Sequence, residues 1–272
     1  MSVIRPLDID ELRRQFDTAE PFRHLCIDGF LEPEFAAEVA AAYPSFETAL
    51  ERGFSFNYVN ERKKVQVTDS SKFPESVARL HQAIASQEFR DQLGEITGIP
   101  RLLADEQLVG GGMHVTGPHG RLDVHVDFNY VADRKLHRRL NILVYLNPDW
   151  QYDWGGEVEL WDPQVRRCYQ ALRPMLNRCV IFETSEISFH GVAAVTCPEG
   201  HERKSFAAYY YTREPPPGWD GTEHSTVFRA RPDERLRGYV LMPAEKIQRT
   251  VKMRVDRVRH RVRRLLGSDA KA

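Results

Sequence analysis

The segment RLDVHVDFNY, residues 121–130, alternates apolar and polar side chains in the manner of a β-strand. Within it, His125 and Asp127 are two positions apart, so on a strand both point to the same face and can reach one point in space. This pattern is typical of two ligands of a metal ion. A polar pair on a solvated sheet face gives the same pattern, and a metal ion also needs a third ligand from elsewhere in the chain.

The residues around this segment predict a β-rich core. Eight candidate strands, separated by Gly, Pro, Asn and Asp, follow one another from about Leu108 to Thr212: QLVGGGMHV, RLDVHVDF, RRLNILVYLN, GEVELW, RCYQALRP, NRCVIFET, SFHGVAAV and RKSFAAYYYT. This density of short strands indicates a sandwich or jelly roll. Both faces of residues 203–211 are largely apolar, as expected when helices cover the outside of a sheet.

Three regions are predicted from the flanking sequence. Residues 1–103, with helical stretches such as EPEFAAEVAAAYP and PESVARLHQAIAS, form a helical region packed on one sheet of the core. Residues 104–213 form the jelly-roll core, and residues 214–272 form a proline-rich exit and a basic C-terminal helix. The apolar seam of that helix is spaced four, three, four, three: Val251, Val255, Val258, Val262 and Leu265.

Charge and composition exclude several classes of protein. The net charge is −1 over 272 residues, so no long-range field favours nucleic acid as a partner. Only residues 245–272 are strongly basic, with ten Lys or Arg against three acids. This helix is interpreted as a contact with the body of the protein or with a second copy in a homodimer. Contact with a polyanion or an anionic membrane is the alternative, less favoured because the seam lacks Trp and Phe.

Cysteine usage and the apolar pattern suggest a location. The four cysteines, Cys26, Cys168, Cys179 and Cys197, form no CxxC pair, which is typical of a reducing compartment. No stretch is predicted to be a signal peptide or a membrane span. The cytoplasm is therefore the expected location.

A third metal ligand and an anion site are predicted on later strands. His190 begins a β-run, and a jelly roll places early and late strands side by side. Two imidazoles and one carboxylate on one face of Fe(II) leave three adjacent positions open, the facial triad of non-haem iron oxygenases. Arg203 and Ser205 face the same way on a strand, so a planar guanidinium and a hydroxyl could bind one carboxylate of a chelating 2-oxo acid.

This ordered set of motifs resembles a known family. His125-Val-Asp127, His190 and Arg203-Lys-Ser205 resemble the HxD…H…RxS pattern of the Fe(II)/2-oxoglutarate-dependent dioxygenases, in particular their prolyl-4-hydroxylase-like branch. YLNPDWQYDWGGEVELW, residues 145–161, and FLEPEFAAEVAAAYP are also similar to segments of that branch. The resemblance covers about residues 21–213 and leaves the C-terminal tail unexplained.

The resemblance implies a fold and a set of site residues. The fold is a double-stranded β-helix, mainly β with α. The implied iron ligands and catalytic residues are His125, Asp127 and His190, and the implied cosubstrate-binding residues are Arg203, Ser205, Tyr145 and Asn141. Where the family places a cosubstrate-contacting tyrosine before HxD, this sequence has MHVTGPHG, so His114 or Thr116 is the expected substitute.

The resemblance also implies an activity. Fe(II) and 2-oxoglutarate are the implied cofactors, and ascorbate is a further candidate. The implied reaction hydroxylates an unactivated C–H bond of a small molecule, sugar or peptidyl substrate and releases succinate and CO₂. The alternative is a cosubstrate-free metal-binding jelly roll, either an isomerase or a hydrolase, or a non-catalytic module that binds sugar or peptide. Neither alternative needs Arg203-Lys-Ser205.

One basic run has two interpretations. Arg62, Lys63 and Lys64 follow one another before the predicted core, and they could bind an anionic group of the substrate. A solvated run of charges is the more ordinary explanation.

Overall fold

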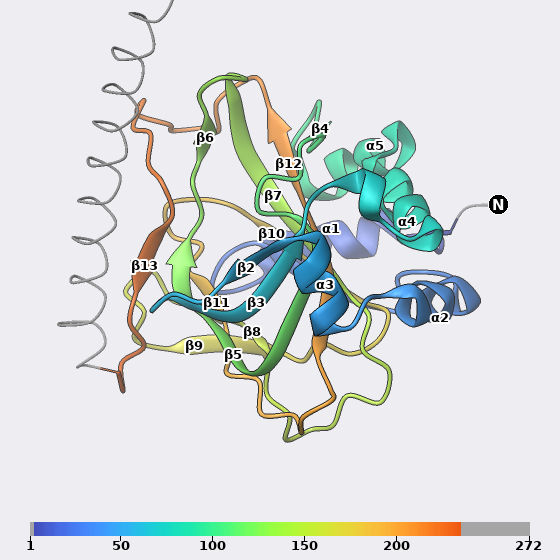
Figure 1. Ribbon diagram of the computed structural model, residues 1–272. Coiled ribbons are helices and arrows are strands. Elements are labelled where there is room, and N and C mark those ends of the chain that lie inside the picture. Colours follow the sequence, from blue (N-terminus) through green and yellow to red (C-terminus); the bar gives the residue numbers. More distant parts are fainter. Residues whose placement is uncertain (1–2, 235–272) are drawn as a thin grey trace, which may run out of the picture. The chain divides into compact units, whose positions relative to one another are not determined.

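The computed structural model describes residues 3–234 (Figure 1). The chain divides into two compact units, Met1–Arg229 and Ala230–Ala272, and the first contains all the helices and strands described below. The predicted basic C-terminal helix, and with it the expected dimer or polyanion contact, lies outside the described residues. Among residues 3–234, no helix has the length and apolarity needed to cross a membrane.

The first unit combines helices near its N-terminus with strands throughout. Its α-helices are α1 Ile9–Thr18, α2 Pro33–Ala42, α3 Phe46–Arg52, α4 Glu75–Ala85 and α5 Gln87–Thr97. Its strands are β1 His24–Asp28, β2 Phe54–Phe56, β3 Glu61–Val67, β4 Leu103–Ala104, β5 Gly112–Val126, β6 Tyr130–Val131, β7 Leu136–Tyr145, β8 Val158–Trp161, β9 Cys168–Leu172, β10 Arg178–Glu183, β11 His190–Val192, β12 Arg203–Thr212 and β13 Val227–Arg229.

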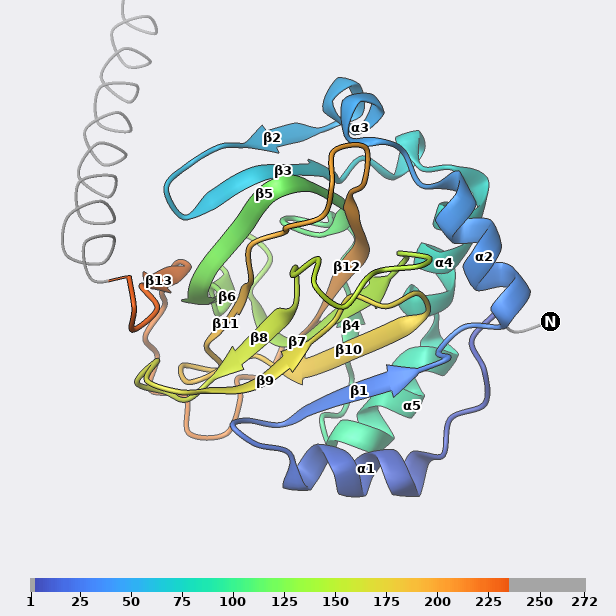
Figure 2. The ribbon, with the colours of Figure 1, turned by 90° about the horizontal axis from the view of Figure 1, so that it is seen from below.

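The strands form a nearly closed antiparallel barrel of the predicted jelly-roll type (Figure 2). The main path runs β1-β10-β7-β12-β5-β11-β8-β9. The first half of β5 pairs with β12 and its second half with β11 and β13, while β3 pairs with both halves, so β5 belongs to both layers. The sequence predicts two separate strands in this region. They are halves of one strand that bends near His119, whose φ is 64°.

Helices cover the outer face of the β10-β7-β12 layer, as predicted (Figure 2). The apolar faces of α2, α4 and α5 share one core with the outward residues of β7, namely Leu140, Ile142 and Val144. Each such side chain contributes about 1.5–3 kcal/mol when it is fully buried. Because side chains alternate along a strand, Asn141, Leu143 and Tyr145 point into the barrel instead.

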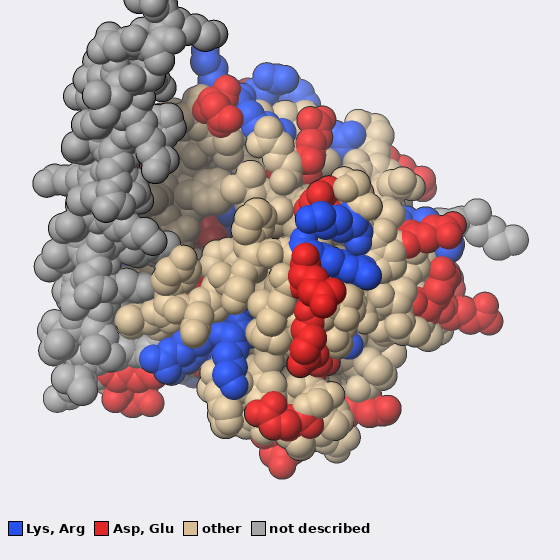
Figure 3. Space-filling model, in the orientation of Figure 1, with Lys and Arg blue, Asp and Glu red and all other residues tan. Residues whose placement is uncertain are grey.

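Strand β12 shows the same division of its two faces. Phe206 and Tyr210 pack against the helices, and the Tyr210 hydroxyl donates to the carbonyl of Ile84 at 2.7 Å. Arg203 and Ser205 therefore point into the barrel, where both are buried. On the outer surface, by contrast, acidic and basic side chains are interspersed over the face shown in Figure 3.

The strand β13 extends this unit beyond the predicted core. After the proline-rich segment, Val227–Arg229 returns to the barrel and pairs with Val124–Val126 of β5. Phe228 lies opposite His125, and their ring centroids are 5.3 Å apart. The first unit consequently ends at Arg229.

Candidate metal centre and anion site

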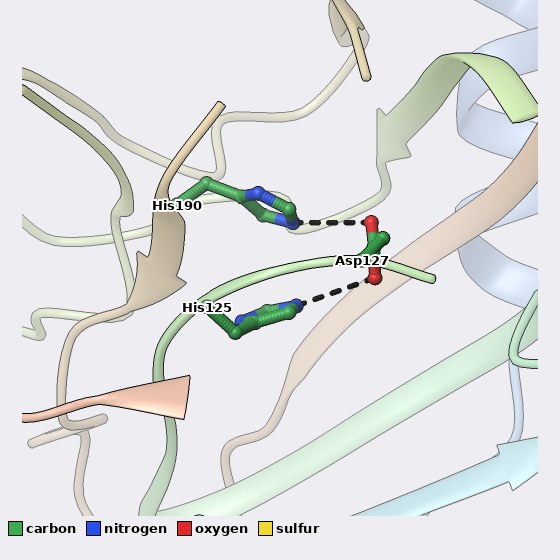
Figure 4. Close-up of side chains that lie close together, drawn as sticks. All are labelled: His125, Asp127 and His190. Atoms are coloured by element: carbon green, nitrogen blue, oxygen red, sulfur yellow. Dashed lines mark ion pairs between the residues drawn. The ribbon is translucent and has the colours of Figure 1, made fainter. Parts of the chain in front are cut away.

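The three predicted metal ligands meet at one end of β5 (Figure 4). His125 lies on β5, Asp127 follows it, and His190 of β11 pairs directly with His125. Asp127 Oδ1 lies 3.5 Å from His125 Nε2, and Asp127 Oδ2 lies 3.5 Å from His190 Nε2. The three ligand atoms all lie within 4.8 Å of one another. The structure thus brings together residues that are far apart in the sequence.

Backbone carbonyls orient both imidazoles. His125 Nδ1 lies 2.9 Å from the carbonyl of Asp123, and His190 Nδ1 lies 2.9 Å from the carbonyl of Ser188. A carbonyl oxygen only accepts, so each Nδ1 carries a proton, and in the neutral form of either imidazole the lone pair is on Nε2. Metal-binding histidines are commonly oriented in this way.

Two further side chains hold the carboxylate. Asp127 Oδ2 accepts from Arg138 Nη2 at 2.9 Å and from Asn141 Nδ2 at 2.8 Å. Arg138 also donates to Asn141 Oδ1, through Nε at 3.0 Å and Nη2 at 2.9 Å. The guanidinium itself lies 3.5 Å from the ring centroid of Tyr209 and 4.6 Å from that of Phe128. The Asp127 carboxylate is therefore held in place by two buried side chains of β7 as well as by its own segment of backbone.

The electrostatics favour the metal-binding forms of these groups. Burial would raise the pKa of Asp127, but the Arg138 guanidinium outweighs it and holds that pKa well below its usual range. Burial, assisted by His125, lowers the pKa of His190 to about 3. At neutral pH Asp127 is therefore ionised and His190 is neutral. A carboxylate with two imidazole nitrogens directed at one point fits Fe(II).

A buried cation marks a second position inside the barrel. Arg203 is 3% exposed and donates only to neutral groups: Nε to the Gly156 carbonyl at 2.6 Å, Nη1 to Ser205 Oγ at 3.4 Å and Nη2 to the Tyr145 hydroxyl at 3.3 Å. Within residues 3–234, no carboxylate forms an ion pair with this guanidinium. Burying a charge without a counter-charge is costly. The arrangement is therefore suited to an anionic ligand.

Gly156 makes this position of Arg203 possible. Its φ of 74° lies in the left-handed region, and a Cβ there would come within 3.0 Å of Arg203 Cδ and 3.3 Å of Trp150. Glycine is the residue that tolerates both conditions.

Tyr145 and Ser205 lie directly opposite each other on β7 and β12, and both contact Arg203. Burial raises the pKa of Tyr145 to about 12, so its hydroxyl remains a hydrogen-bond donor. Asn141 shares the inner face of β7 but contacts the metal ligand Asp127. Its expected contact with the cosubstrate stays a prediction.

The two suggested replacements for the missing tyrosine also lie near Arg203. Thr116 pairs with Arg203 and His114 with Ser205, so both point into the barrel. His114 Nε2 lies 3.0 Å from the carbonyl of Gly110. Burial, together with the cations Lys64 and Arg203, holds the pKa of His114 well below its usual value. A cosubstrate contact by either residue remains a prediction.

The sequence did not single out Arg138 or Phe228. The one signal for Arg138 was a charged residue within LHRRLNILVY, an otherwise apolar strand whose residues 136–142 are all buried. Phe228 gave no signal, because its position depends on β13 returning to β5.

A jelly roll that holds two imidazoles, a carboxylate and a separate buried guanidinium has the features of a metal-dependent oxygenase that uses an acidic cosubstrate. Comparison with known families agrees, since residues 111–211 match the model of the 2OG-Fe(II) oxygenase superfamily. The chain carries a domain of this superfamily and is prolyl-4-hydroxylase-like in fold. The superfamily name gives 2-oxoglutarate and Fe(II) as the two cofactors. That Arg203 binds 2-oxoglutarate stays a prediction.

Individual proteins with similar sequence or structure include prolyl hydroxylases. Mouse prolyl 3-hydroxylase OGFOD1 is 36% identical over 78 residues, which is 27% of this chain and 14% of that protein. The Xenopus laevis protein of the same name is 32% identical over 90 residues, or 30% of this chain and 17% of that protein. The matches therefore span less than a fifth of the length of these two relatives.

Two solved structures share the fold at low sequence identity. A Pseudomonas putida prolyl-4-hydroxylase superimposes with a TM-score of 0.54 at 17% identity, covering 74% of this chain and 99% of that one. A Trichoplax adhaerens prolyl hydroxylase, in complex with a hypoxia inducible factor peptide fragment, also has a TM-score of 0.54, at 15% identity and 75% and 88% coverage.

Proposed function

We propose that this protein is an Fe(II)- and 2-oxoglutarate-dependent dioxygenase that hydroxylates an unactivated C–H bond and releases succinate and CO₂. The observation that carries the proposal is the buried Arg203, which has no carboxylate partner among the described ion pairs and shares the barrel interior with His125, Asp127 and His190. A metal-binding jelly roll without a cosubstrate has no need of such a cation.

The residues around Arg203 bind and orient the cosubstrate. The planar guanidinium suits a bidentate contact with one carboxylate, and the hydroxyls of Tyr145 and Ser205 lie within hydrogen-bonding distance of it. Because these groups bind one end of the dicarboxylate, the 2-oxo acid end remains for the metal. Bound Fe(II) supplies the redox chemistry that couples oxidation of 2-oxoglutarate to hydroxylation.

The residues around the metal site hold the ligand set and exclude water. Arg138 and Asn141 keep Asp127 in place, and the carbonyls of Asp123 and Ser188 keep the imidazole Nε2 atoms available. Phe228 covers one side of His125. Such preorganisation is the contribution that the protein makes to cofactor chemistry.

The substrate is proposed to be a small molecule, a sugar or a peptidyl group. The names of the OGFOD1 relatives and the bound peptide of the Trichoplax adhaerens enzyme support peptidyl proline as one candidate. All four cysteines are free, which supports a reducing compartment such as the cytoplasm.

The test is formation of succinate from 2-oxoglutarate with Fe(II) and O₂. Wild-type protein is expected to release succinate slowly alone and faster when a true substrate is added. Asp127→Ala should abolish the reaction. Asp28→Ala is the matched control, because Asp28 also binds an arginine, Arg178, but lies on the exposed end of β1. Wild-type protein that binds iron but never forms succinate would favour the cosubstrate-free alternative.

A further inference from the structure

A second cation, Lys64 of β3, lies inside the barrel. Lys64 pairs with Thr116 of β5, and Thr116 pairs with Arg203 of β12. Residues directly paired on antiparallel strands point to the same face. Lys64, Thr116 and Arg203 therefore form one row across three strands, and all three are buried.

A β-bulge turns Lys64 inward. The register of β3 shifts between Arg62 and Lys64, and Lys63 between them has a φ of 43°. A bulge adds a residue to one strand and redirects the side chains beside it. Arg62 and Lys63 are exposed, whereas Lys64 is 8% exposed. Of this basic run, two residues belong to the surface and one to the interior.

The charge of Lys64 is partly compensated. Its Nζ donates to Glu61 Oε1 at 2.8 Å and lies 5.8 Å from the ring centroid of Phe56. The side chains of Lys64 and Glu61 are 10% and 16% exposed. An ammonium group has three donors, and Glu61 accepts from one of them. The interior row thus contains two cations, Lys64 and Arg203, with one carboxylate bonded to the lysine.

The two cations, Lys64 and Arg203, lie on different strands and have different hydrogen-bond partners. Arg203 donates to Gly156, Ser205 and Tyr145, and Tyr145 is on β7, whereas Lys64 lies two strands away from Arg203 on the other side of β5. Neighbouring strands are about 4.8 Å apart, so the backbones of β3 and β12 are separated by about 10 Å. Lys64 is therefore placed to bind an anionic group other than the one that Arg203 binds.

We propose that Lys64, beside the hydroxyl of Thr116, binds a carboxylate or phosphate group of the substrate. This inference rests on the proposed function. There, one carboxylate of 2-oxoglutarate binds Arg203 and the other end binds the metal, so a further anionic group comes from the substrate. The substrate is then an acidic small molecule or a peptide with an acidic residue near the position that is hydroxylated.

The experiment uses the 272-residue chain loaded with Fe(II) and saturating 2-oxoglutarate without O₂. L-aspartate, L-malate and inorganic phosphate are titrated as separate probes, and the visible charge-transfer band of the metal complex reports binding next to the metal. Lys64→Gln is compared with Lys63→Gln, which removes the same charge one residue away on the surface. At least one probe should bind wild type and Lys63→Gln and bind Lys64→Gln at least about tenfold more weakly.

Three outcomes are decisive against the inference or its foundation. If every probe binds Lys64→Gln as tightly as it binds wild type, or binds neither, then Lys64 and Glu61 form a structural ion pair and the inference is overturned. If Lys64→Gln weakens the binding of 2-oxoglutarate, Lys64 binds the cosubstrate and its assignment to the substrate is wrong. If wild type forms no 2-oxoglutarate band before any probe is added, the proposed function itself fails.

Lys64→Arg separates charge from packing. This variant keeps a cation on β3, so probe binding should remain within a few-fold of wild type. Loss of probe binding in Lys64→Arg as severe as in Lys64→Gln, with the 2-oxoglutarate band intact in both, would show that the charge is not what the probe recognises.

Discussion

Two charged side chains of the same barrel, Asp127 and Arg203, differ in whether an oppositely charged side chain binds them. Asp127 is an anion that receives hydrogen bonds from Arg138 and Asn141, and its charge is compensated before any ligand binds. Arg203 is a cation that donates only to a carbonyl and two hydroxyls. The metal end is therefore held in place by the protein alone, whereas the anion end is electrostatically incomplete until an acidic ligand arrives.

The difference has a functional consequence. A preformed carboxylate and two oriented imidazoles bind a metal ion with little rearrangement. A buried guanidinium without an ion-pair partner, opposed only by the longer-range charge of Glu157, instead carries an unfavourable desolvation energy, which is relieved when a carboxylate binds. The structure thus predicts that the two ends respond differently to the same kind of substitution.

The largest expected effect is on the stability of the metal-free protein. Arg138→Met leaves Asp127, whose side chain is 14% exposed, without its cation and should cost about 3–5 kcal/mol of unfolding free energy. Arg203→Met removes an uncompensated charge and should cost less than about 1 kcal/mol, because lost packing is offset by relieved desolvation. Urea denaturation of both variants measures this. If both variants lost the same unfolding free energy, the charge of Arg203 would be balanced by other groups of the protein.

The next effect concerns binding of 2-oxoglutarate. Arg203→Ala removes the partner of the distal carboxylate and should weaken binding by about 2–5 kcal/mol, or at least about 30-fold. Calorimetric titration of the iron-loaded protein measures this. Arg203→Lys keeps the charge but loses the planar pair of donors, so an intermediate affinity is expected. Iron affinity should be unchanged in both variants, and a parallel loss of iron would contradict the division into two ends.

A smaller effect is expected from Asn141, on iron rather than on the cosubstrate. Asn141→Ala removes one hydrogen bond to Asp127 and should weaken iron binding about 10–100-fold. Asn147→Ala is the control, because Asn147 is equally buried but bonds to the carbonyls of Pro174 and Lys204. If Asn141→Ala weakened 2-oxoglutarate binding and left iron binding unchanged, Asn141 would serve the cosubstrate, as the family resemblance implies, and not the metal ligand Asp127.

The smallest effect is expected for the ion pair on the surface. Arg178 binds Asp28 through two hydrogen bonds of 2.6 and 2.8 Å, but the Asp28 side chain is 68% exposed. Asp28→Asn should therefore cost less than about 1 kcal/mol.

The difference in stability between wild type and Asp28→Asn depends on pH through the pKa of Asp28. The hydrogen bond from Arg178 lowers this pKa below its usual value of about 3.9. A group whose folded pKa is depressed stabilises the protein above its unfolded pKa and loses that contribution as the pH falls through the folded pKa. Thermal unfolding of wild type and Asp28→Asn should differ at pH 7 and converge below about pH 4. A difference that grew in acid would contradict the assignment.

The sequence predicted the parts of the site that depend on local pattern and strand order. His125 and Asp127 share a face because strand residues alternate, and His190 joins them because a jelly roll pairs early with late strands. Arg203 and Ser205 were placed on one face by the same rule, and the structure shows both buried near Tyr145.

The parts that were missed depend on tertiary context. Arg138 looks like an ordinary surface arginine until the strand is buried on both faces. The resemblance named Asn141 for the cosubstrate, but no local pattern decides which end of the barrel an inward residue of β7 contacts, and its amide contacts Asp127. The inward turn of Lys64 requires a bulge, and a bulge shifts the very alternation on which the prediction relies.

The most direct test of a metal site and a separate cosubstrate site is an anaerobic titration of metal-free protein with Fe(II) and then 2-oxoglutarate, followed by visible absorption. We expect the weak charge-transfer band of the chelated complex only when both are present. Asp127→Ala should lose the band because iron no longer binds, and Arg203→Ala should form it only at 2-oxoglutarate concentrations at least about 30-fold higher, although iron still binds. A band of unchanged affinity in Arg203→Ala, or no band in wild type with iron bound, would contradict the claim that the two ends of this barrel hold one metal ion and one acidic cosubstrate.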